Sequence, residues 1–290
     1  MGMPRSGTTL MRSILNAHPS LALAPETHLL DHWMQVHRRT DLTDAAGFAS
    51  FWSEFAASPH FRWTGLDADE VEGLIKQAGT PSFRSIFDIL LTAYAARLGK
   101  PRPGEKTPGN YRYLDTLLDW YPHARVLYMV RDPRGVVASW EAHGRPWTDK
   151  PLVTIASRWR RAAERAERWA RDDRVAVVRY EALATAPEPE LRRICEHLDE
   201  PFAAAMIERP ATADDIPSPD TEVSTVSIER WRTELTNHEI AVTEHLTAAP
   251  MARLGYERSL PALPRRTRLQ LSAQGLQQRA AGVGRRLARR

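Results

Sequence analysis

The sequence predicts an α/β fold with a central parallel sheet flanked by helices, and three observations support this prediction. Short apolar runs at residues 21–24, 125–130 and 175–178 have the composition of buried parallel strands. Segments with apolar residues at helical spacing separate these runs. A charged or proline-containing turn follows each run, as is usual where ligands bind at the carboxyl ends of parallel strands.

The first turn of the chain, at residues 2–10, reads GMPRSGTTL. Gly2 and Gly7 permit backbone angles that other residues resist, so the turn can curl around a ligand. A helix N-terminus with several free amides favours an anion, and Arg5 adds a full positive charge. The turn therefore predicts a phosphate cradle built from Arg5, Ser6, Gly7, Thr8 and Thr9.

This turn is close to the P-loop pattern G-x-x-x-x-G-K-[ST], but Thr8 stands where that pattern has lysine. A site without that lysine can bind a phosphate without hydrolysing a triphosphate. The predicted architecture is therefore a P-loop-type three-layer fold. A strand normally precedes such a turn, and only Met1 precedes Gly2, so we expect a truncated first strand and a natural start upstream.

The other elements are expected in a regular order. A helix from Thr9 to Ala17 precedes the strand at 21–24, which delivers Glu26 at its carboxyl end. A largely helical insertion is expected over 27–98. Its tryptophans Trp33, Trp52 and Trp63 are expected in the core, with the wall of the acceptor pocket as the alternative. The remaining expectations are a loop at 99–108 carrying Lys106, helices at 110–120, 153–170 and around 191–198, and Cys195 as a core residue.

A second candidate phosphate site follows the strand at 125–130. Arg131 leaves the end of this strand, and Ser139 lies eight positions on, across a strand-to-helix turn, so both can converge on one anion. The alternative for Arg131 is a salt bridge with Asp132 or Glu141. Two phosphate sites on one sheet imply a ligand phosphorylated at both ends.

Composition limits the class of protein. The 290 residues are 42% apolar and 26% charged, as in a soluble globular protein with one large domain. A single cysteine excludes an internal disulfide framework, and we expect no metal site. We find no apolar run near 18 residues and no signal peptide before the first turn, so we expect a cytoplasmic protein without a membrane span.

The charge is concentrated at the C-terminal end. Residues 261–290 hold eight arginines and no acidic residue, which leaves 32 basic against 36 acidic residues elsewhere. We expect a domain over 1–260 and a basic, flexible tail over 261–290. A role of this tail in binding nucleic acid is the less favoured alternative. A homodimer is possible.

The motifs resemble those of the sulfotransferase family, which uses 3′-phosphoadenosine-5′-phosphosulfate (PAPS) as sulfuryl donor. The run PRSGTTL at 4–10 resembles the family's 5′-phosphosulfate loop, and VRDPRGVVAS at 130–139 resembles its 3′-phosphate motif. The similarity continues through Val178-Arg179-Tyr180-Glu181 to Gly255-Tyr256. It implies that Arg131, Ser139 and Tyr180 hold the donor, with adenosine 3′,5′-bisphosphate (PAP) as product.

Residues 2–27 are most similar to the tyrosylprotein sulfotransferases. That resemblance implies that Glu26 is the catalytic base and that Lys106 contacts the transferring group, with Arg5 as a second cation. From the residues alone, His28 is the second choice of base, and Glu26 could instead be an acid that interacts with a helix dipole. The acceptor, an unidentified hydroxyl or amine, has no recognisable code in the sequence.

Two other classes stay open. A P-loop kinase or NTPase would use Asp132, after an apolar strand, to hold magnesium. A nucleotide-binding protein that has lost catalysis would keep the phosphate cradle but would transfer no group.

Overall fold

The computed structural model describes the whole chain except residues 143–150, 209–224, 262–263 and 265–290. The predicted basic tail at 261–290 therefore lies almost entirely outside the described residues. Within the described part, no helix is both long and apolar enough to cross a membrane.

Two pairs of parallel strands form the centre of the molecule. Strand β1 (Leu21–Ala24) pairs with β2 (Arg102–Glu105), and β3 (Val126–Val130) pairs with β4 (Val175–Arg179). Leu21 lies opposite Arg102 in the first pair, and Val126 lies opposite Val175 in the second. The predicted α/β fold with parallel strands is confirmed.

Met1 and Gly2 lie beside β3 in the position expected for the first strand. Gly2 forms an isolated parallel bridge with Met129, and the Met129 amide donates to the Met1 carbonyl at 2.8 Å. A cavity of about 530 Å³ lies between β2 and β3 and is lined largely by apolar side chains from α1, β1 and β3.

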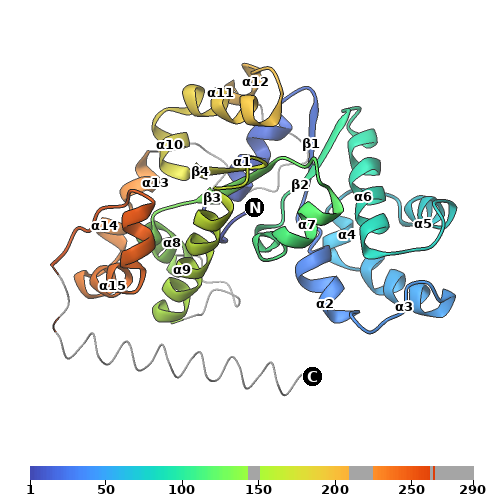
Figure 1. Ribbon diagram of the computed structural model, residues 1–290, viewed down its shortest axis with the longest axis horizontal. Helices are drawn as coiled ribbons and strands as arrows, with labels where there is room; N and C mark the ends of the chain where they lie inside the picture. The colour runs from blue at the N-terminus through green and yellow to red at the C-terminus, as the bar shows by residue number, and fades with distance from the viewer. Residues whose placement is uncertain (143–150, 209–224, 262–263, 265–290) are drawn as a thin grey trace.

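The helices surround these strands (Figure 1). Their bounds are α1 (Thr8–Asn16), π-helix η1 (Leu29–Trp33), α2 (Met34–Val36), α3 (Ala45–Ala56), α4 (Pro59–Arg62), α5 (Ala68–Gln77), α6 (Phe83–Arg97), 3-10 helix η2 (Pro108–Arg112), α7 (Leu114–Trp120), α8 (Pro133–Glu141), α9 (Leu152–Trp169), α10 (Tyr180–Thr185), α11 (Pro187–Leu198), α12 (Ala205–Glu208), α13 (Val226–Glu229), α14 (Trp231–Glu234) and α15 (Asn237–Arg253).

Helices cover both faces of the β3–β4 pair, which gives the predicted three layers. Apolar residues of α8, α9 and α15 pack with Tyr128 and Val130 on one face. Residues of α1, α10 and α11, Cys195 among them, pack with Leu127 and Met129 on the other. The alternation of side chains along a strand directs neighbouring residues of β3 to these two cores.

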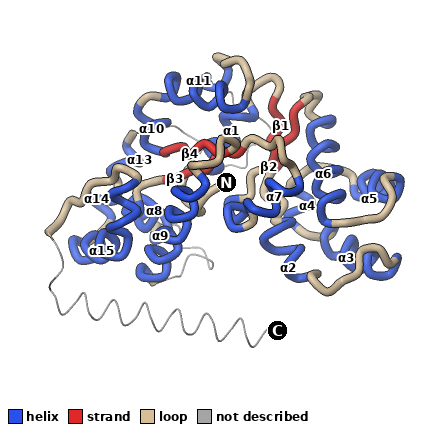
Figure 2. The backbone as a smooth tube through the Cα atoms, in the orientation of Figure 1, coloured by secondary structure: helices blue, strands red, loops and turns tan. Residues whose placement is uncertain are grey.

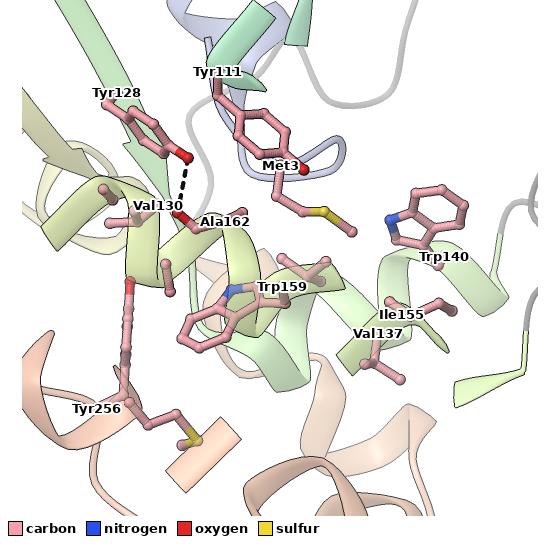
Figure 3. Packing of buried hydrophobic residues seen from close by; sticks show 14 of the residues in the cluster. Met3, Tyr111, Tyr128, Val130, Val137, Trp140, Ile155, Trp159, Ala162 and Tyr256 are labelled. Atoms are coloured by element: carbon pink, nitrogen blue, oxygen red, sulfur yellow. Dashed lines mark hydrogen bonds between the residues drawn. The ribbon is translucent and has the colours of Figure 1, made fainter. Parts of the chain in front are cut away.

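Figure 3 shows part of the first core, where the Tyr128 hydroxyl donates to the Ala162 carbonyl at 2.8 Å. Met3, from the loop before α1, packs in this cluster near Tyr111 and Trp140. The first turn of the chain is therefore fixed to the core by its own side chain.

A separate, mostly helical region covers η1 through α7 and has its own aromatic core (Figure 2). Phe51 and Phe55 are fully buried and stack with ring centroids 5.6 Å apart. Trp33 and Trp52 are also buried, but Trp63 is 49% exposed, so its predicted core position is wrong.

Two further expectations need correction, and one helix was missed. The predicted loop at 99–108 contains β2, which forms because its backbone pairs with β1 although Pro103 and Gly104 disfavour strands. The predicted helix at 110–120 is divided into η2 and α7. Helix α15 was not predicted, and its weak amphipathic pattern follows from its burial between α8 and α9.

Candidate active site

The loop before α1 has the geometry of an anion cradle. Arg5 has a φ of 74° and Gly7 a φ of 84°, so both residues are in the left-handed region. No side chain caps the first turn of α1 in the described structure, which leaves its amides for a ligand. The Ser6 hydroxyl is fully buried and has no hydrogen-bond partner among the described residues.

Neighbouring side chains hold this loop in place. The Trp140 indole donates to the Pro4 carbonyl at 3.3 Å. A Cβ atom added to Gly7 would lie 2.5 Å from Cδ2 of Tyr180, so the loop passes directly over this ring. Only glycine combines that close approach with the left-handed backbone at position 7.

The two predicted phosphate sites meet at Arg5. Its Nε donates to the Ser139 hydroxyl at 3.0 Å, and its carbonyl accepts from Arg131 Nη1 at 3.2 Å. Arg131 and Ser139 thus both contact Arg5, and their convergence on one anion stays a prediction. Ser139 is in α8, and Arg131 lies two residues before that helix.

Arg131 is 7% exposed, and its guanidinium stacks 4.4 Å from the centroid of the Tyr180 ring. Its alternative role, a salt bridge with Asp132, is wrong, because Asp132 pairs with Arg134 at 2.6 Å and caps α8. The side chain of Glu141, the other alternative partner, lies outside the described residues. Asp132 is therefore engaged in structure rather than exposed at a magnesium site.

Sequence reasoning missed Ser227. Its carbonyl accepts from Arg131 Nη2 at 2.7 Å, and its hydroxyl forms a short hydrogen bond with that of Tyr180. Ser227 is in the short helix α13, far from either motif along the chain. No pattern around it distinguishes it from any other surface serine, so only the fold identifies it.

Glu26 and Lys106 follow the carboxyl ends of β1 and β2, which are paired and parallel. This topology places the two side chains in contact, and the Lys106 ammonium donates to Oε1 of Glu26 in a short ion pair. Lys106 also donates to the Thr9 hydroxyl at 3.3 Å. The predicted base is therefore connected to the predicted donor loop through one lysine.

The charges around Glu26 keep it ionised. Burial opposes ionisation, but the hydrogen bond from His28 and the charge of Lys106 lower the pKa of Glu26 from 4.5 to about 2. Its side chain is still 26% exposed, so an acceptor can approach. Glu26 precedes η1 without capping it, which disfavours the helix-dipole alternative.

The pKa of His28 shifts in the opposite direction to that of Glu26. Burial favours the neutral ring, but hydrogen bonds with Asp31 and Glu26 raise the pKa of His28 from 6.5 to about 10. A protonated imidazole cannot accept a proton, so of the two candidate bases the structure favours Glu26.

Glu105, the last residue of β2, connects the two segments that carry the reactive side chains. Its carboxylate accepts from the Thr27 hydroxyl at 3.1 Å, the Thr107 amide at 2.8 Å and the Asn110 amide group at 2.9 Å. Burial raises the pKa of Glu105 above its usual value, although the hydrogen bonds from Thr107 and Thr27 oppose this shift. The carboxylate thus ties Thr27, next to Glu26, to Thr107, next to Lys106.

The described residues contain no group of three or more histidine, cysteine or acidic side chains arranged to hold a metal ion. The site instead combines an anion-binding loop, the half-buried Arg5, the buried Arg131 and the ion pair between Glu26 and Lys106. This arrangement suits the transfer of an anionic group to an acceptor that loses a proton.

Comparison with known proteins decides the family. A family model described as "Sulfotransferase family" matches residues 1–204, which include every predicted site residue but not Ser227. The chain belongs to the sulfotransferase family. The resemblance inferred from the two phosphate motifs is confirmed.

Two curated relatives are similar over most of this chain. A protein-tyrosine sulfotransferase of Drosophila melanogaster is 28% identical over 216 residues, which are 71% of this chain and 38% of that protein. The nodulation protein NoeE of Sinorhizobium fredii is 27% identical over 296 aligned positions, covering 90% of this chain and 66% of NoeE. This sulfotransferase-family chain thus spans less than two thirds of either relative.

Among solved structures, the sulfotransferase domain of the Synechococcus PCC 7002 olefin synthase has a TM-score of 0.65 and 23% identity. The alignment covers 90% of this chain and 94% of that domain. The chain therefore has the fold of a sulfotransferase domain.

Proposed function

We propose that this protein transfers the sulfuryl group of PAPS to a hydroxyl or amine of an acceptor, with Glu26 as the general base. One observation carries the proposal: Lys106 contacts both Thr9 of the anion-binding loop and the Glu26 carboxylate. A single ammonium therefore lies between the place for a donor anion and the group that would deprotonate an acceptor.

Two anion-binding regions support PAPS as donor. The uncapped first turn of α1 and the buried Ser6 hydroxyl offer hydrogen bonds to the 5′-phosphosulfate. Arg131 and Ser139, which both contact Arg5, offer a guanidinium and a hydroxyl to the 3′-phosphate. Arg131 would exchange contacts with two carbonyl oxygens for contacts with a phosphate, a stronger charge-assisted interaction.

Sulfuryl transfer resembles phosphoryl transfer, with a loose, in-line transition state in which positioning and electrostatics dominate. Glu26 accepts the acceptor's proton as its oxygen or nitrogen forms a bond to sulfur. The bond from sulfur to the bridging oxygen breaks, and PAP leaves with the electron pair. Lys106 and Arg5 stabilise the negative charge that grows on the bridging and phosphate oxygens.

The kinase alternative is weaker on the same observations. Thr8 occupies the P-loop lysine position, and Asp132, the candidate magnesium ligand, is 6% exposed and paired with Arg134. Transfer from PAPS would instead use the side-chain cations of Arg5, Lys106 and Arg131 to stabilise the donor's negative charge.

The test has two parts. Isothermal titration calorimetry should show that PAP binds at least tenfold more tightly than ATP, because only PAP carries a 3′-phosphate. Incubation with ³⁵S-labelled PAPS and a panel of phenols, sugars, lipids and amines should then label at least one acceptor class. Equal affinity for ATP, together with ATP turnover that depends on magnesium, would show that the proposal is wrong.

A further inference from the structure

The loop between β1 and η1 holds a histidine between two carboxylates. His28 Nε2 lies 3.2 Å from Oε2 of Glu26, and His28 Nδ1 lies 2.8 Å from Oδ1 of Asp31. Both ring nitrogens therefore face a carboxylate oxygen, and two such contacts require a doubly protonated imidazolium. His28 thus places a fixed positive charge beside Glu26.

Asp31 is itself fixed. Its second oxygen, Oδ2, accepts from Arg112 Nη2 at 3.2 Å, and its side chain is 9% exposed. A Cβ atom at Gly109 would lie 2.0 Å from that same oxygen, so the backbone of η2 packs directly against the carboxylate. The orientation of the His28 ring is therefore set from η2, on the side opposite Glu26.

The backbone of His28 is held in a costly conformation. Its φ of 51° is left-handed, which is uncommon for a residue with a side chain. The His28 amide donates to the Thr107 hydroxyl at 3.3 Å, and its carbonyl accepts from the amides of His32 and Trp33 at 3.1 Å. These contacts begin the π-helix η1, a type of helix often found at functional sites.

The two cations beside Glu26 use different oxygens. Lys106 contacts Oε1, and His28 contacts Oε2. Lys106 also contacts Thr9 of the donor loop, so its ammonium can serve either the donor or Glu26. His28 has no contact with the donor loop among the interactions of the described residues, and it keeps its partner when Lys106 turns to the donor.

We infer that His28 is a positioning residue for the proposed reaction: its imidazolium, anchored by Asp31, aims the Glu26 carboxylate at the acceptor while Lys106 serves the donor. This inference rests on the proposed function. It assigns a role to Glu26, His28 and Asp31, which lie outside the two phosphate motifs. His28 itself neither binds the donor nor accepts the proton.

The surroundings of His28 fit this role. The His60 ring lies 4.6 Å from the His28 ring, and its Nδ1 accepts from the Trp33 indole at 3.2 Å. Burial and the charge of His28 lower the pKa of His60 to about 4, so the neighbour is neutral. The titratable groups that interact with His28 are Glu26, Asp31, His60 and Glu105. Lys106, Arg112 and His32 contact Glu26, Asp31 and His60 in turn.

The first arm of the test does not need activity. In ¹⁵N NMR titrations of the whole chain, the ring nitrogens of His28 should stay protonated to about pH 10. In Asp31→Asn the titration should move to lower pH, because one carboxylate partner is lost. A His28 ring that titrates near 6.5 in the wild-type protein would overturn the inference.

The second arm is kinetic and uses whichever acceptor the labelled-PAPS panel identifies. His28→Gln should lower kcat roughly tenfold or more, leave the Km for PAPS within about twofold, and move the acidic limb of the pH profile to higher pH. His28→Arg, which keeps a cation with donors for both carboxylates, should recover most of the rate and extend the alkaline limb. His238→Gln, an exposed histidine on α15, is the control.

Unchanged kcat in His28→Gln, or an equal loss in His28→Arg and His28→Gln, would overturn the positioning role. Circular dichroism of each variant at the assay temperature separates loss of rate from loss of fold. If the wild-type protein binds PAP but labels no acceptor, the proposed transfer fails, whereas the NMR arm still decides whether His28 holds its charge between the two carboxylates.

Discussion

At the scale of single residues, the site is a series of side chains in contact whose charges alternate in sign. Lys106, Glu26, His28, Asp31 and Arg112 follow one another, each in contact with the next. Each carboxylate in this series has a cation on both sides, which compensates the cost of its partial burial. The same alternation leaves Glu26 ionised and able to take a proton.

Lys106→Met should test the double role of this lysine. Loss of the ammonium removes a transition-state cation, so the single-turnover rate of transfer should fall roughly 100- to 1,000-fold. PAP affinity should fall much less. The control is Lys76→Met, which removes a lysine that pairs with Glu72 on α5. An unchanged single-turnover rate would show that Lys106 takes no part in the transfer step.

The pKa shifts in this series also predict how stability depends on pH. The raised pKa of His28 means that its contribution is complete below 6.5 and is lost as the pH rises through about 10. The lowered pKa of Glu26 means that its contribution is complete above 4.5 and is lost as the pH falls toward about 2. The difference in Tm between wild type and His28→Gln should therefore be largest between about pH 4.5 and 6.5 and should shrink by pH 10. A constant difference in differential scanning fluorimetry would contradict these charge states.

At the scale of elements, the loop before α1 depends on one glycine. Gly7→Ala would place a methyl group 2.5 Å from Tyr180 in a backbone conformation that costs about 1–2 kcal/mol for other residues. We expect a lower Tm and at least a tenfold loss of PAP affinity by calorimetry. Gly73→Ala on α5, where the added Cβ meets nothing within 4 Å, should instead raise stability by about 0.5–1 kcal/mol. Unchanged PAP affinity in Gly7→Ala would show that this loop is not the donor site.

The sequence predicted those elements whose pattern is local. The apolar runs gave β1 with the correct bounds and β3 and β4 within one residue, because buried parallel strands need continuous apolar residues. Strand β2 was missed because Arg102, Pro103 and Gly104 have no strand preference, and pairing with β1 alone determines their conformation. The contact between Glu26 and Lys106 follows from that pairing.

The site was predictable where a motif brings its residues together. Arg5, Thr9, Arg131 and Ser139 lie in two short motifs, and the structure places them around one loop. Ser227 and Asp31 belong to no such motif. Ser227 contacts Arg131 from an element that is distant along the chain, and Asp31 contacts His28 within a single turn of η1.

At the scale of the whole molecule, a buried ion-pair network joins the helices that cover one face of the β3–β4 pair. Arg134 on α8 pairs with Asp132 at 2.6 Å and with Glu244 on α15 at 2.7 Å, and it stacks 4.0 Å from the centroid of the Trp231 ring. Glu244 is fully buried. This network fixes α15 and α14 to the helix that carries Ser139.

Arg134→Met would leave Glu244 and Asp132 buried without their main cation. The free energy of unfolding should fall by about 3–5 kcal/mol, as measured for other buried pairs that lose one partner. Arg253→Met, which breaks an exposed pair with Glu167, should cost less than about 1 kcal/mol. Equal effects of the two substitutions in chemical denaturation would contradict the importance of the buried network.

The central claim is that Glu26 is the base of a transfer from PAPS, and one measurement tests it most directly: single-turnover transfer from ³⁵S-labelled PAPS by Glu26→Gln, with PAP binding measured on the same sample. If Glu26 is the base, the rate should be roughly 100-fold or more below wild type, with PAP affinity close to that of wild type. Wild-type transfer by Glu26→Gln to every acceptor in the panel would contradict it.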